Sequence, residues 1–308
     1  MAEITAAAIK DLREKTQAGM MDCKKALTEC KGDMEEAIDW LRKKGLSAAA
    51  KKSGRIAAEG LVGVTTNGSE TEAAVVEINT ETDFAAKNEK FQALLSNVTK
   101  LALQGSGDVE ELKKKAYPGK SNDVAQEVAE LVGVIGENIQ LRRSAKVSGD
   151  VVVSYLHNAV NKELGKIGVL VALKSSGNKE KLKALGKQIA MHVAANRPES
   201  LNVADLDPKL VERERSILTE QARASGKPDN VIEKMIEGRI QKFYAEVVLV
   251  EQAFVMDGKT PIREVLKEAA KDIGGEVTIA SYVRFMLGEG IEKKEENFAD
   301  EVAKAANA

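Results

Sequence analysis

The side chains that most often carry catalytic chemistry are scarce in this chain of 308 residues. It contains two histidines, His157 and His192, and two cysteines, Cys23 and Cys30. Neither histidine lies in a Ser/His or Cys/His nucleophile motif, and the four side chains lack the close spacing of a zinc cluster. We therefore expect structural histidines, no catalytic residue, no metal site and no cofactor. Two such thiols are more simply explained as small buried side chains in a reducing compartment than as a disulfide.

One short segment imitates a phosphate-binding loop. Residues 118–121 read Pro-Gly-Lys-Ser, like the end of a P-loop, but the first glycine of that motif would have to stand where Lys114 is. A strand should also precede such a loop, whereas residues 110–113 have a helical pattern. We reject a nucleotide site here and expect Ser121 to cap a helix over residues 122–132.

The most informative segment is a corner around an aromatic side chain. Residues 73–78 are largely apolar and predict a strand. Phe91 and the apolar residues that follow it at helical spacing predict a helix. Thr82 or Asp83 is a suitable N-cap for that helix, so Phe84 falls in the first turn, at a strand-to-helix junction.

Phe84 allows two interpretations. It lies seven residues before Phe91, so both rings could line the buried face of one helix. Alternatively, Phe84 is an anchor for a partner protein, because interface anchors are enriched in aromatic side chains. Spacing alone favours core packing.

Composition narrows the class of protein. The chain is 43% hydrophobic and 31% charged, which is ordinary for a globular protein of two or three domains. Its net charge of −2 gives no basic surface that would neutralise phosphates, so we expect no direct nucleic-acid binding. No stretch approaches the roughly 18 apolar residues of a membrane span, and no leader peptide is visible. A cytoplasmic protein is the expectation.

The pattern along the chain predicts an α+β fold. A three-helix N-terminal module is expected to end at Gly45 and to continue into a connector. Two related units follow, each an antiparallel sheet covered by helix, with strands predicted at 59–64, 73–78, 149–156, 167–173, 247–250 and 276–287 and with covering helices that include 179–195 and 261–273. One further segment, from Gly136 to Arg143, is predicted to begin a strand that leads into the second unit.

An antiparallel helical hairpin interrupts the second unit. Two charged helices with apolar stripes flank a turn at residues 225–228, and we expect this hairpin to protrude from the core. The predicted parts are 1–55 for module and connector, 56–145 for the first subdomain, 146–207 with 244–288 for the second, 208–243 for the hairpin and 289–308 for the C-terminal segment.

Five segments of the sequence resemble those of the bacterial translation elongation factor Ts family, the nucleotide-exchange factors of the GTPase elongation factor Tu. They are residues 16–27, 82–85, 135–139, 190–195 and 285–293, and the resemblance covers nearly the whole chain. Two positions depart from the family pattern. Gln17 replaces the usual glycine, and Ala85 replaces the usual valine of the Thr-Asp-Phe-Val element.

The resemblance implies specific roles. The N-terminal module would be similar to a ubiquitin-associated (UBA) domain and would dock on the GTPase through Arg13, Met20 and Met21. The aromatic at Phe84 would insert between helices of the GTPase, with Thr82, Asp83 and Ala85 beside it, and Asp83 would help to disturb the magnesium site. His157 is similar to a contact residue of the second subdomain. In some members the hairpin mediates self-association, so a homodimer is possible.

Two other classes remain to be compared with an exchange factor. An enzyme is disfavoured because no acid/base, nucleophile or metal constellation is visible. A passive adaptor, which binds a partner through the N-terminal module without remodelling it, is the serious alternative. Met21 also retains a second interpretation, as part of the core of the module.

Overall fold

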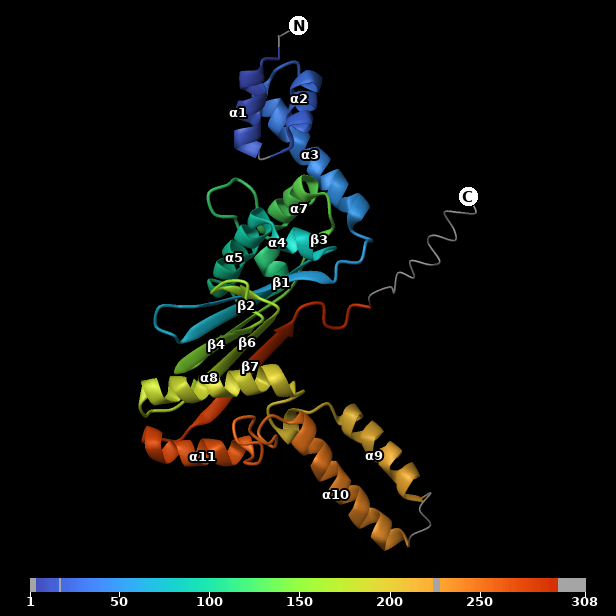
Figure 1. The fold of residues 1–308 in the computed structure, drawn as a ribbon, viewed down its shortest axis with the longest axis vertical. Coiled ribbons are helices and arrows are strands. Elements are labelled where there is room, and N and C mark those ends of the chain that lie inside the picture. The colour runs from blue at the N-terminus through green and yellow to red at the C-terminus, as the bar shows by residue number, and fades with distance from the viewer. Residues whose placement is uncertain (1–3, 17, 224–227, 293–308) are drawn as a thin grey trace.

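The computed structural model describes residues 4–16, 18–223 and 228–292. The molecule is elongated, with the N-terminal helices at one end, two sheets in the middle and a helical hairpin at the other end (Figure 1). Gln17, residues 225–227 of the predicted turn, and residues 293–308 of the predicted C-terminal segment lie outside the described residues. Within the described ranges, no helix is both long enough and apolar enough to cross a membrane.

The N-terminal module consists of α1 (Ala6–Thr16), α2 (Met20–Glu29) and α3 (Met34–Lys52). Asp33 caps α3, because its carboxylate accepts a hydrogen bond from the backbone N–H of Glu36 at 2.8 Å. The small core of the module contains buried, unpaired Cys23 together with Leu12, Ala26, Leu27 and Ala37. The prediction of three helices is confirmed.

The prediction that the third helix ends at Gly45 is wrong. α3 continues through this glycine to Lys52, and Gly45 is buried where α3 crosses α7 (Val124–Ile135). A Cβ added to Gly133 of α7 would lie only 3.3 Å from the Cα of Gly45, so the absence of side chains lets the two helices approach closely. Ala49, one turn further on, packs against the core of the first subdomain. Tertiary packing therefore overrides the helix-terminating tendency of glycine.

The first sheet has the order β3-β2-β1-β5, and all of its pairings are antiparallel. Its strands are β1 (Glu59–Thr66), β2 (Glu72–Thr80), β3 (Ile139–Ser148) and β5 (Leu164–Gly165). Helices α4 (Asp83–Lys87), α5 (Glu89–Leu103), α6 (Val109–Lys113) and α7 cover one face, with Phe91 fully buried between them and the sheet. Here β3 completes the first sheet rather than leading into the second.

The cap predicted for α7 is also wrong. Asp123, not Ser121, is the N-cap, and it forms a capping box with Gln126. The helix consequently begins two residues later than predicted and ends at Gly136, whose φ of 88° lies in the left-handed region that favours glycine.

The second sheet has the order β4-β6-β7, also antiparallel, with strands β4 (Val151–His157), β6 (Ile167–Lys174) and β7 (Thr278–Met286). Helices α8 (Lys179–Asn196) and α11 (Ile262–Ile273) cover its outer face. Residues 247–250 do not form the predicted strand. α10 continues to Val247, and Val248 forms only an isolated bridge with Ser200.

The inner faces of the two sheets pack on each other through apolar side chains, among them Val62, Val75, Leu170 and Phe285. The core therefore has four layers, helix–sheet–sheet–helix, and the predicted α+β class with two helix-covered antiparallel sheets is confirmed.

Buried Glu77 of β2 joins the first sheet to the chain that follows β7. Its carboxylate accepts from the N–H of Gly288 at 2.9 Å and forms ion pairs with Arg142 and Arg143 of β3. Burial by itself raises the pKa of Glu77, but the Gly288 and Arg143 hydrogen bonds outweigh it, so the pKa is lowered. The residues after β7 are thus fixed against the first sheet, up to Glu289.

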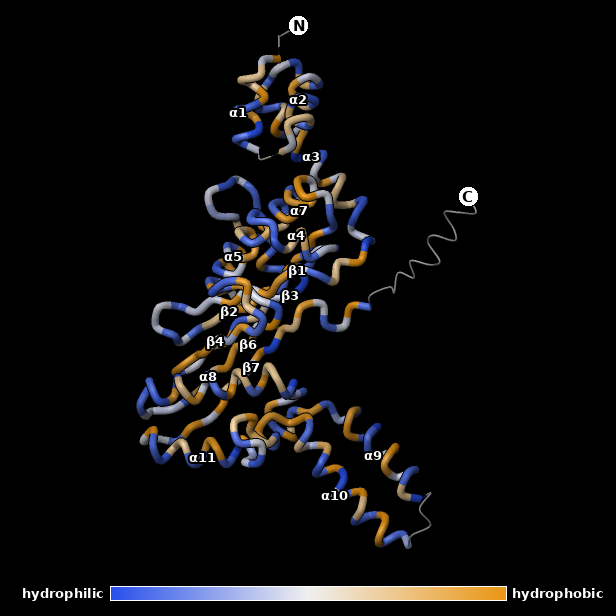
Figure 2. The backbone as a smooth tube through the Cα atoms, viewed as in Figure 1, coloured by the Kyte–Doolittle hydropathy of each residue, from blue (hydrophilic) through white to orange (hydrophobic). Residues whose placement is uncertain are grey.

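Helices α9 (Pro208–Arg223) and α10 (Asp229–Val247) form the predicted hairpin, which projects away from both sheets (Figure 1). Leu218, Ile232, Ile236 and Ile240 bury the seam between the two helices. Apolar residues recur along both helices, and Leu210, Ile217 and Val231 are each about two-fifths exposed (Figure 2). The prediction of a protruding hairpin is confirmed.

Candidate partner-binding corner

Residues 82–87, which we call the Phe84 corner, follow directly from the end of β2. Thr82 has an extended backbone and caps the short helix α4, because its Oγ1 accepts from the N–H of Ala85 at 3.2 Å. Ala85 and Ala86 lie on the buried face of α4. Asn88 then ends α4 and caps α5, with its Oδ1 accepting from the N–H of Lys90 at 2.9 Å.

The second cap, Asn88, determines whether Phe84 is buried or exposed. Two helices with different axes stand where the spacing suggested one, so the seven-residue interval to Phe91 no longer places both rings on one face. Phe91 is fully buried, whereas the Phe84 side chain is 78% exposed. The core-packing interpretation is wrong. An exposed aromatic ring on a capped helix is a feature typical of binding surfaces.

The carboxylate of Glu137 holds the first residues of the corner. Its Oε2 accepts from Thr80 Oγ1 at 3.0 Å and from the N–H of Thr82 at 2.9 Å, and its Oε1 accepts from Thr82 Oγ1 at 2.7 Å. Glu137 lies in the loop between α7 and β3, 55 residues away from Thr82 in sequence. The corner is therefore fixed by a long-range contact and not by its local sequence alone.

A reciprocal contact ties the same two segments together. Glu81 Oε1 accepts from the N–H of Asn138 at 2.6 Å, and the Asn138 side chain donates to the carbonyl of Arg55 at 2.7 Å. Asn138 is buried, so its amide group is satisfied by this arrangement. The end of β2, the α7–β3 loop and the residues after α3 form one hydrogen-bonded unit.

Asp83 and Lys87 make the charged part of the corner. Lys87 Nζ lies 2.6 Å from Asp83 Oδ2 and 5.3 Å from the centre of the Phe84 ring. The hydrogen bond from Lys87 lowers the pKa of Asp83, and the positive charge of Lys166 lowers it further. Both members of the pair are exposed, so the carboxylate is ionised at neutral pH and accessible to a partner.

His157 is the residue predicted to contact a partner from the second subdomain. It is the last residue of β4, and its carbonyl accepts from the N–H of Lys166 at 3.2 Å. The His157 side chain is exposed, and its Nδ1 lies 3.3 Å from the hydroxyl of Tyr155.

The relatives of the chain agree with the resemblance seen in the sequence. A family model described as Elongation factor TS matches residues 81–289. The chain is 60% identical over 306 residues to elongation factor Ts of Rhodospirillum rubrum, covering 98% of each chain. It is 58% identical over 308 residues to that of Rhodospirillum centenum (99% of this chain, all of the relative) and 53% over 305 residues to that of Rhizobium meliloti (98% and 99%).

The chain belongs to the elongation factor Ts family. These relatives match the chain over nearly its whole length, from the N-terminal helices through the hairpin. The match of the family model begins at Glu81, immediately before the Phe84 corner.

The three residues predicted to bind a partner on the N-terminal module are exposed. Met20 and Met21, at the start of α2, are 59% and 75% exposed, so Met21 is not part of the module core. Arg13 is exposed on α1. The module lies beyond α7 from the sheets, so the structure does not bring these residues together with Phe84 (Figure 1).

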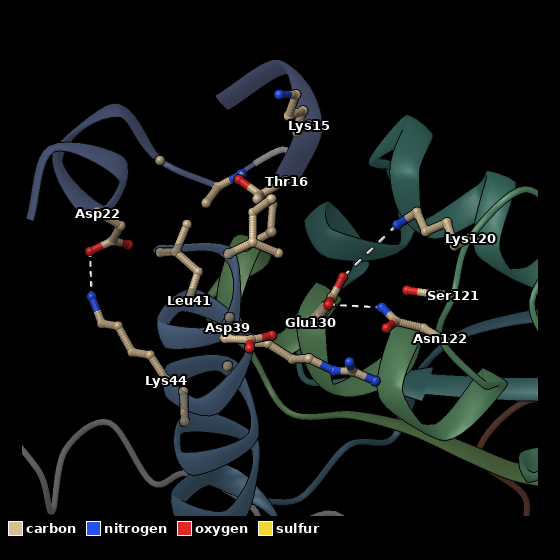
Figure 3. A pocket seen from close by; sticks show the side chains of 18 of the residues that line it. Lys15, Thr16, Asp22, Asp39, Leu41, Lys44, Lys120, Ser121, Asn122 and Glu130 are labelled. Carbon is tan, nitrogen blue, oxygen red and sulfur yellow. Dashed lines mark hydrogen bonds and ion pairs between the residues drawn. The ribbon is translucent and has the colours of Figure 1, made fainter. Parts of the chain in front are cut away.

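A cavity of about 400 Å³ separates the module from the first subdomain (Figure 3). Polar contacts hold side chains on both of its walls. Lys44 pairs with Asp22 on the module side, and Asn122 donates to Glu130 at 2.8 Å on the other. Lys120, in the segment that imitates a P-loop, donates to Glu127 at 2.6 Å. The Lys120 ammonium is therefore held by carboxylates of the protein itself.

His192 is structural, as predicted. It is fully buried in α8, its Nε2 lies 2.9 Å from Gln252 Oε1, and its Nδ1 accepts from the N–H of Val255 at 3.1 Å. Burial lowers the pKa of His192, partly offset by the hydrogen bond to Gln252. Because Nδ1 is an acceptor, the neutral ring carries its proton on Nε2.

Sequence reasoning missed Glu137 as a determinant of the corner. The sequence places Glu137 in a strand-forming segment and in a segment that resembles the family, and no local pattern connects it to Thr82. Among the described residues, no group of three or more His, Cys, Asp or Glu side chains is arranged to hold a metal ion.

Proposed function

We propose that this protein is a guanine-nucleotide exchange factor that binds the translation GTPase elongation factor Tu and promotes release of GDP. The observation that carries the proposal is the 78% exposure of Phe84 on a capped and hydrogen-bonded corner. Membership of the elongation factor Ts family supports it, because exchange on elongation factor Tu is the activity that the family resemblance implies.

The proposed mechanism uses binding energy against the nucleotide. Insertion of Phe84 between helices of the GTPase contributes roughly 2–4 kcal/mol if the ring acts as a central anchor. Asp83 carries its negative charge beside the ring and approaches the magnesium site of the GTPase. Magnesium bridges phosphate oxygens and protein ligands in tight geometry, so a small displacement weakens nucleotide binding steeply. Thr82 orients this segment, and Ala85 packs beneath it.

The two remaining contact regions supply affinity. Arg13, Met20 and Met21 dock the N-terminal module on the nucleotide-binding domain of the GTPase, and His157 contacts it from the second subdomain. Exchange is then a negative coupling between two ligands of one GTPase, and thermodynamic linkage requires that GDP weaken binding of this protein by the same factor. No catalytic residue of this protein takes part.

The deciding experiment measures release of a fluorescent GDP from elongation factor Tu, with and without this protein. An exchange factor accelerates release at catalytic concentrations. A passive adaptor, the alternative function, forms a complex but leaves the release rate unchanged. Binding in the presence and absence of excess GDP tests the reciprocity, since an adaptor binds both forms of the GTPase equally.

A further inference from the structure

We propose that Glu137 is a positioning residue, whose carboxylate fixes the Phe84 corner in one orientation before any partner binds. The inference rests on the proposed function only for its effect on nucleotide exchange. The order that Glu137 imposes on the free protein can be tested without a GTPase.

The first step is the arrangement of donors around the carboxylate. Thr80 Oγ1, the Thr82 N–H and Thr82 Oγ1 all donate to Glu137, at 3.0, 2.9 and 2.7 Å. Both carboxylate oxygens are used. Hydrogen bonds to an ionised acceptor are shorter and stronger than neutral ones, so three of them on one side chain define its place closely.

The second step is the transfer of this constraint to α4. Thr82 Oγ1 donates to Glu137 and at the same time accepts from the N–H of Ala85. The orientation of the cap therefore depends on Glu137. A helix of five residues does not hold its own direction in water, because nucleation is costly and few internal hydrogen bonds form. The Glu137 contact at one end and the buried Ala85 and Ala86 at the other supply that direction.

The third step is the rigidity of Glu137 itself. It follows Gly136, which ends α7 in the left-handed conformation, and it precedes Asn138, which is buried and bonded to Glu81 and to Arg55. The positioning side chain thus lies in a loop that is held on both sides. Phe84 projects from a fixed base, although its own ring is exposed. Such preorganisation reduces the ordering cost of binding.

The chemistry of two variants separates position from charge. In Glu137→Gln, the amide oxygen can take the place of Oε2 and accept from Thr80 and the Thr82 N–H, while the amide nitrogen donates to Thr82 Oγ1. Glu137→Ala removes every acceptor and leaves the Thr82 N–H without its partner. We therefore expect Gln to preserve the corner largely and Ala to release it.

The first test is amide hydrogen exchange in the free protein, followed by NMR. In Glu137→Ala, the amide protons of Thr82 and Ala85 should exchange about tenfold faster or more, because local opening governs exchange there. The Gln variant should stay within about threefold of wild type. Unchanged protection of both amides in Glu137→Ala overturns the proposal, whatever the GTPase assay shows.

The second test is a double-mutant cycle on fluorescent-GDP release from elongation factor Tu, with wild type, Glu137→Ala, Phe84→Ala and the double variant. If Glu137 acts through Phe84, its replacement should slow exchange about tenfold in the wild-type background but by less than about twofold in the Phe84→Ala background. Equal factors in both backgrounds overturn the positioning role. If Phe84→Ala itself exchanges normally, the proposed function of the corner fails, while the hydrogen-exchange result still decides the structural claim.

Glu127→Ala is the matched control. Glu127 is a buried carboxylate of the preceding helix that accepts from Lys120 and Asn122 and makes no contact with the corner in the described structure. Its loss should lower the melting temperature without changing protection of Thr82 and Ala85. A Glu127→Ala variant that loses protection at these two amides to the same extent would show that general destabilisation explains the effect, and would overturn the proposal.

Discussion

The Phe84 corner and the start of α2 both expose large apolar side chains at the first turn of a helix, but they are built differently. Phe84 is 78% exposed, and Met20 and Met21 are 59% and 75% exposed. The cap of α4 is Thr82, whose side chain is bonded on two sides. The cap of α2 is Gly19, which has no side chain to cap the helix.

The side chains at the two sites also differ in rigidity. A phenyl ring has two rotatable bonds and a fixed shape, whereas methionine has more torsions and a polarisable thioether that adapts to irregular surfaces. A rigid ring on a held base can displace groups of a partner. Flexible side chains on a glycine-capped helix suit a contact that contributes affinity without imposing a geometry. Surfaces of similar exposure can therefore serve opposite purposes.

The strongest test of this contrast is Phe84→Ala. We expect exchange to slow by roughly 30-fold or more, because a central aromatic anchor contributes about 2–4 kcal/mol. The melting temperature should change little, since the ring is exposed. Stopped-flow release of fluorescent GDP and a thermal melt measure the two quantities. A collapsed melting transition together with normal exchange by the remaining folded protein would return Phe84 to the core.

Removal of the module should have the next largest effect. The predicted boundary would suggest deleting residues 1–55, but Ala49 packs on the first subdomain and the Arg55 carbonyl accepts from Asn138. A deletion of residues 1–43 is the cleaner experiment. It should weaken binding to elongation factor Tu by about tenfold or more, because a second linked contact is lost.

The two deletions can be compared directly. The shorter one should keep a cooperative melt close to that of wild type, and the longer one should lower the melting temperature. Calorimetry of both proteins checks this. A 1–43 deletion that binds as tightly as wild type would show that the module does not dock. Only the Phe84 corner would then remain as a partner-binding surface in this comparison.

Met20→Ala with Met21→Ala should have a smaller effect. The concentration for half-maximal exchange should rise about threefold to tenfold, while the maximal rate stays the same, since an adaptable contact contributes affinity only. Leucine at both positions serves as the control and should behave nearly like wild type. A lower maximal rate with unchanged half-saturation would mean that these methionines, too, act on the nucleotide site.

Lys87→Met tests the ion pair between Lys87 and Asp83 beside the Phe84 ring. Lys87 is the main cause of the lowered pKa of Asp83, so this pKa should rise towards its ordinary value of 3.8 in the variant. A group with a lowered folded-state pKa stabilises the fold above its unfolded-state pKa, and this contribution fades as the pH falls through the folded-state value. At neutral pH exchange should change by less than about threefold, because the carboxylate remains ionised. NMR titration of Asp83 measures the shift.

The hairpin should matter least for exchange. Replacing residues 212–239 by a short Gly/Ser turn removes only surfaces distant from the corner in Figure 1, so most activity should remain. Self-association, measured by light scattering, is the property that we expect to change, since partly exposed Leu210, Ile217 and Val231 mark the hairpin as an apolar surface. A folded variant that keeps its oligomeric state yet loses exchange would show that the hairpin takes part in the mechanism.

Much of the fold follows from local patterns in the sequence. The strands and the hairpin helices have clear periodicity, and Asp33, which caps α3, is one of the residue types preferred at helix N-caps. The failures have two causes, because some deciding contacts come from elsewhere in the chain and others are local signals that were missed. Gly45 continues a helix because α7 packs on it, whereas the missed cap of α7, Asp123, is local. Of residues 247–250, only Val247 belongs to α10, and Val248 forms an isolated bridge with Ser200 instead of a strand.

The candidate site contains both a missed local signal and a long-range contact that the sequence does not reveal. Thr82 and Asp83 were correctly placed at a helix start, but one N-cap was expected where Thr82 and Asn88 provide two. Asn88 is a good capping residue, so this second helix start had a local signal. Glu137 had none, because its three hydrogen bonds cross 55 to 57 residues of sequence.

The crossing at Gly45 gives α3 the geometry of a lever. The helix has 19 residues, or about 28 Å at 1.5 Å per residue, and its contact with α7 lies roughly 16 Å from Met34. A 10° change in crossing angle would therefore move the first turn of α3 by about 3 Å relative to the sheets. The separation between the module surface and Phe84 is thus set by the bulk of the two residues at the crossing, Gly45 and Gly133. Larger side chains there would alter which GTPase surfaces both contacts can span at once, without touching either contact.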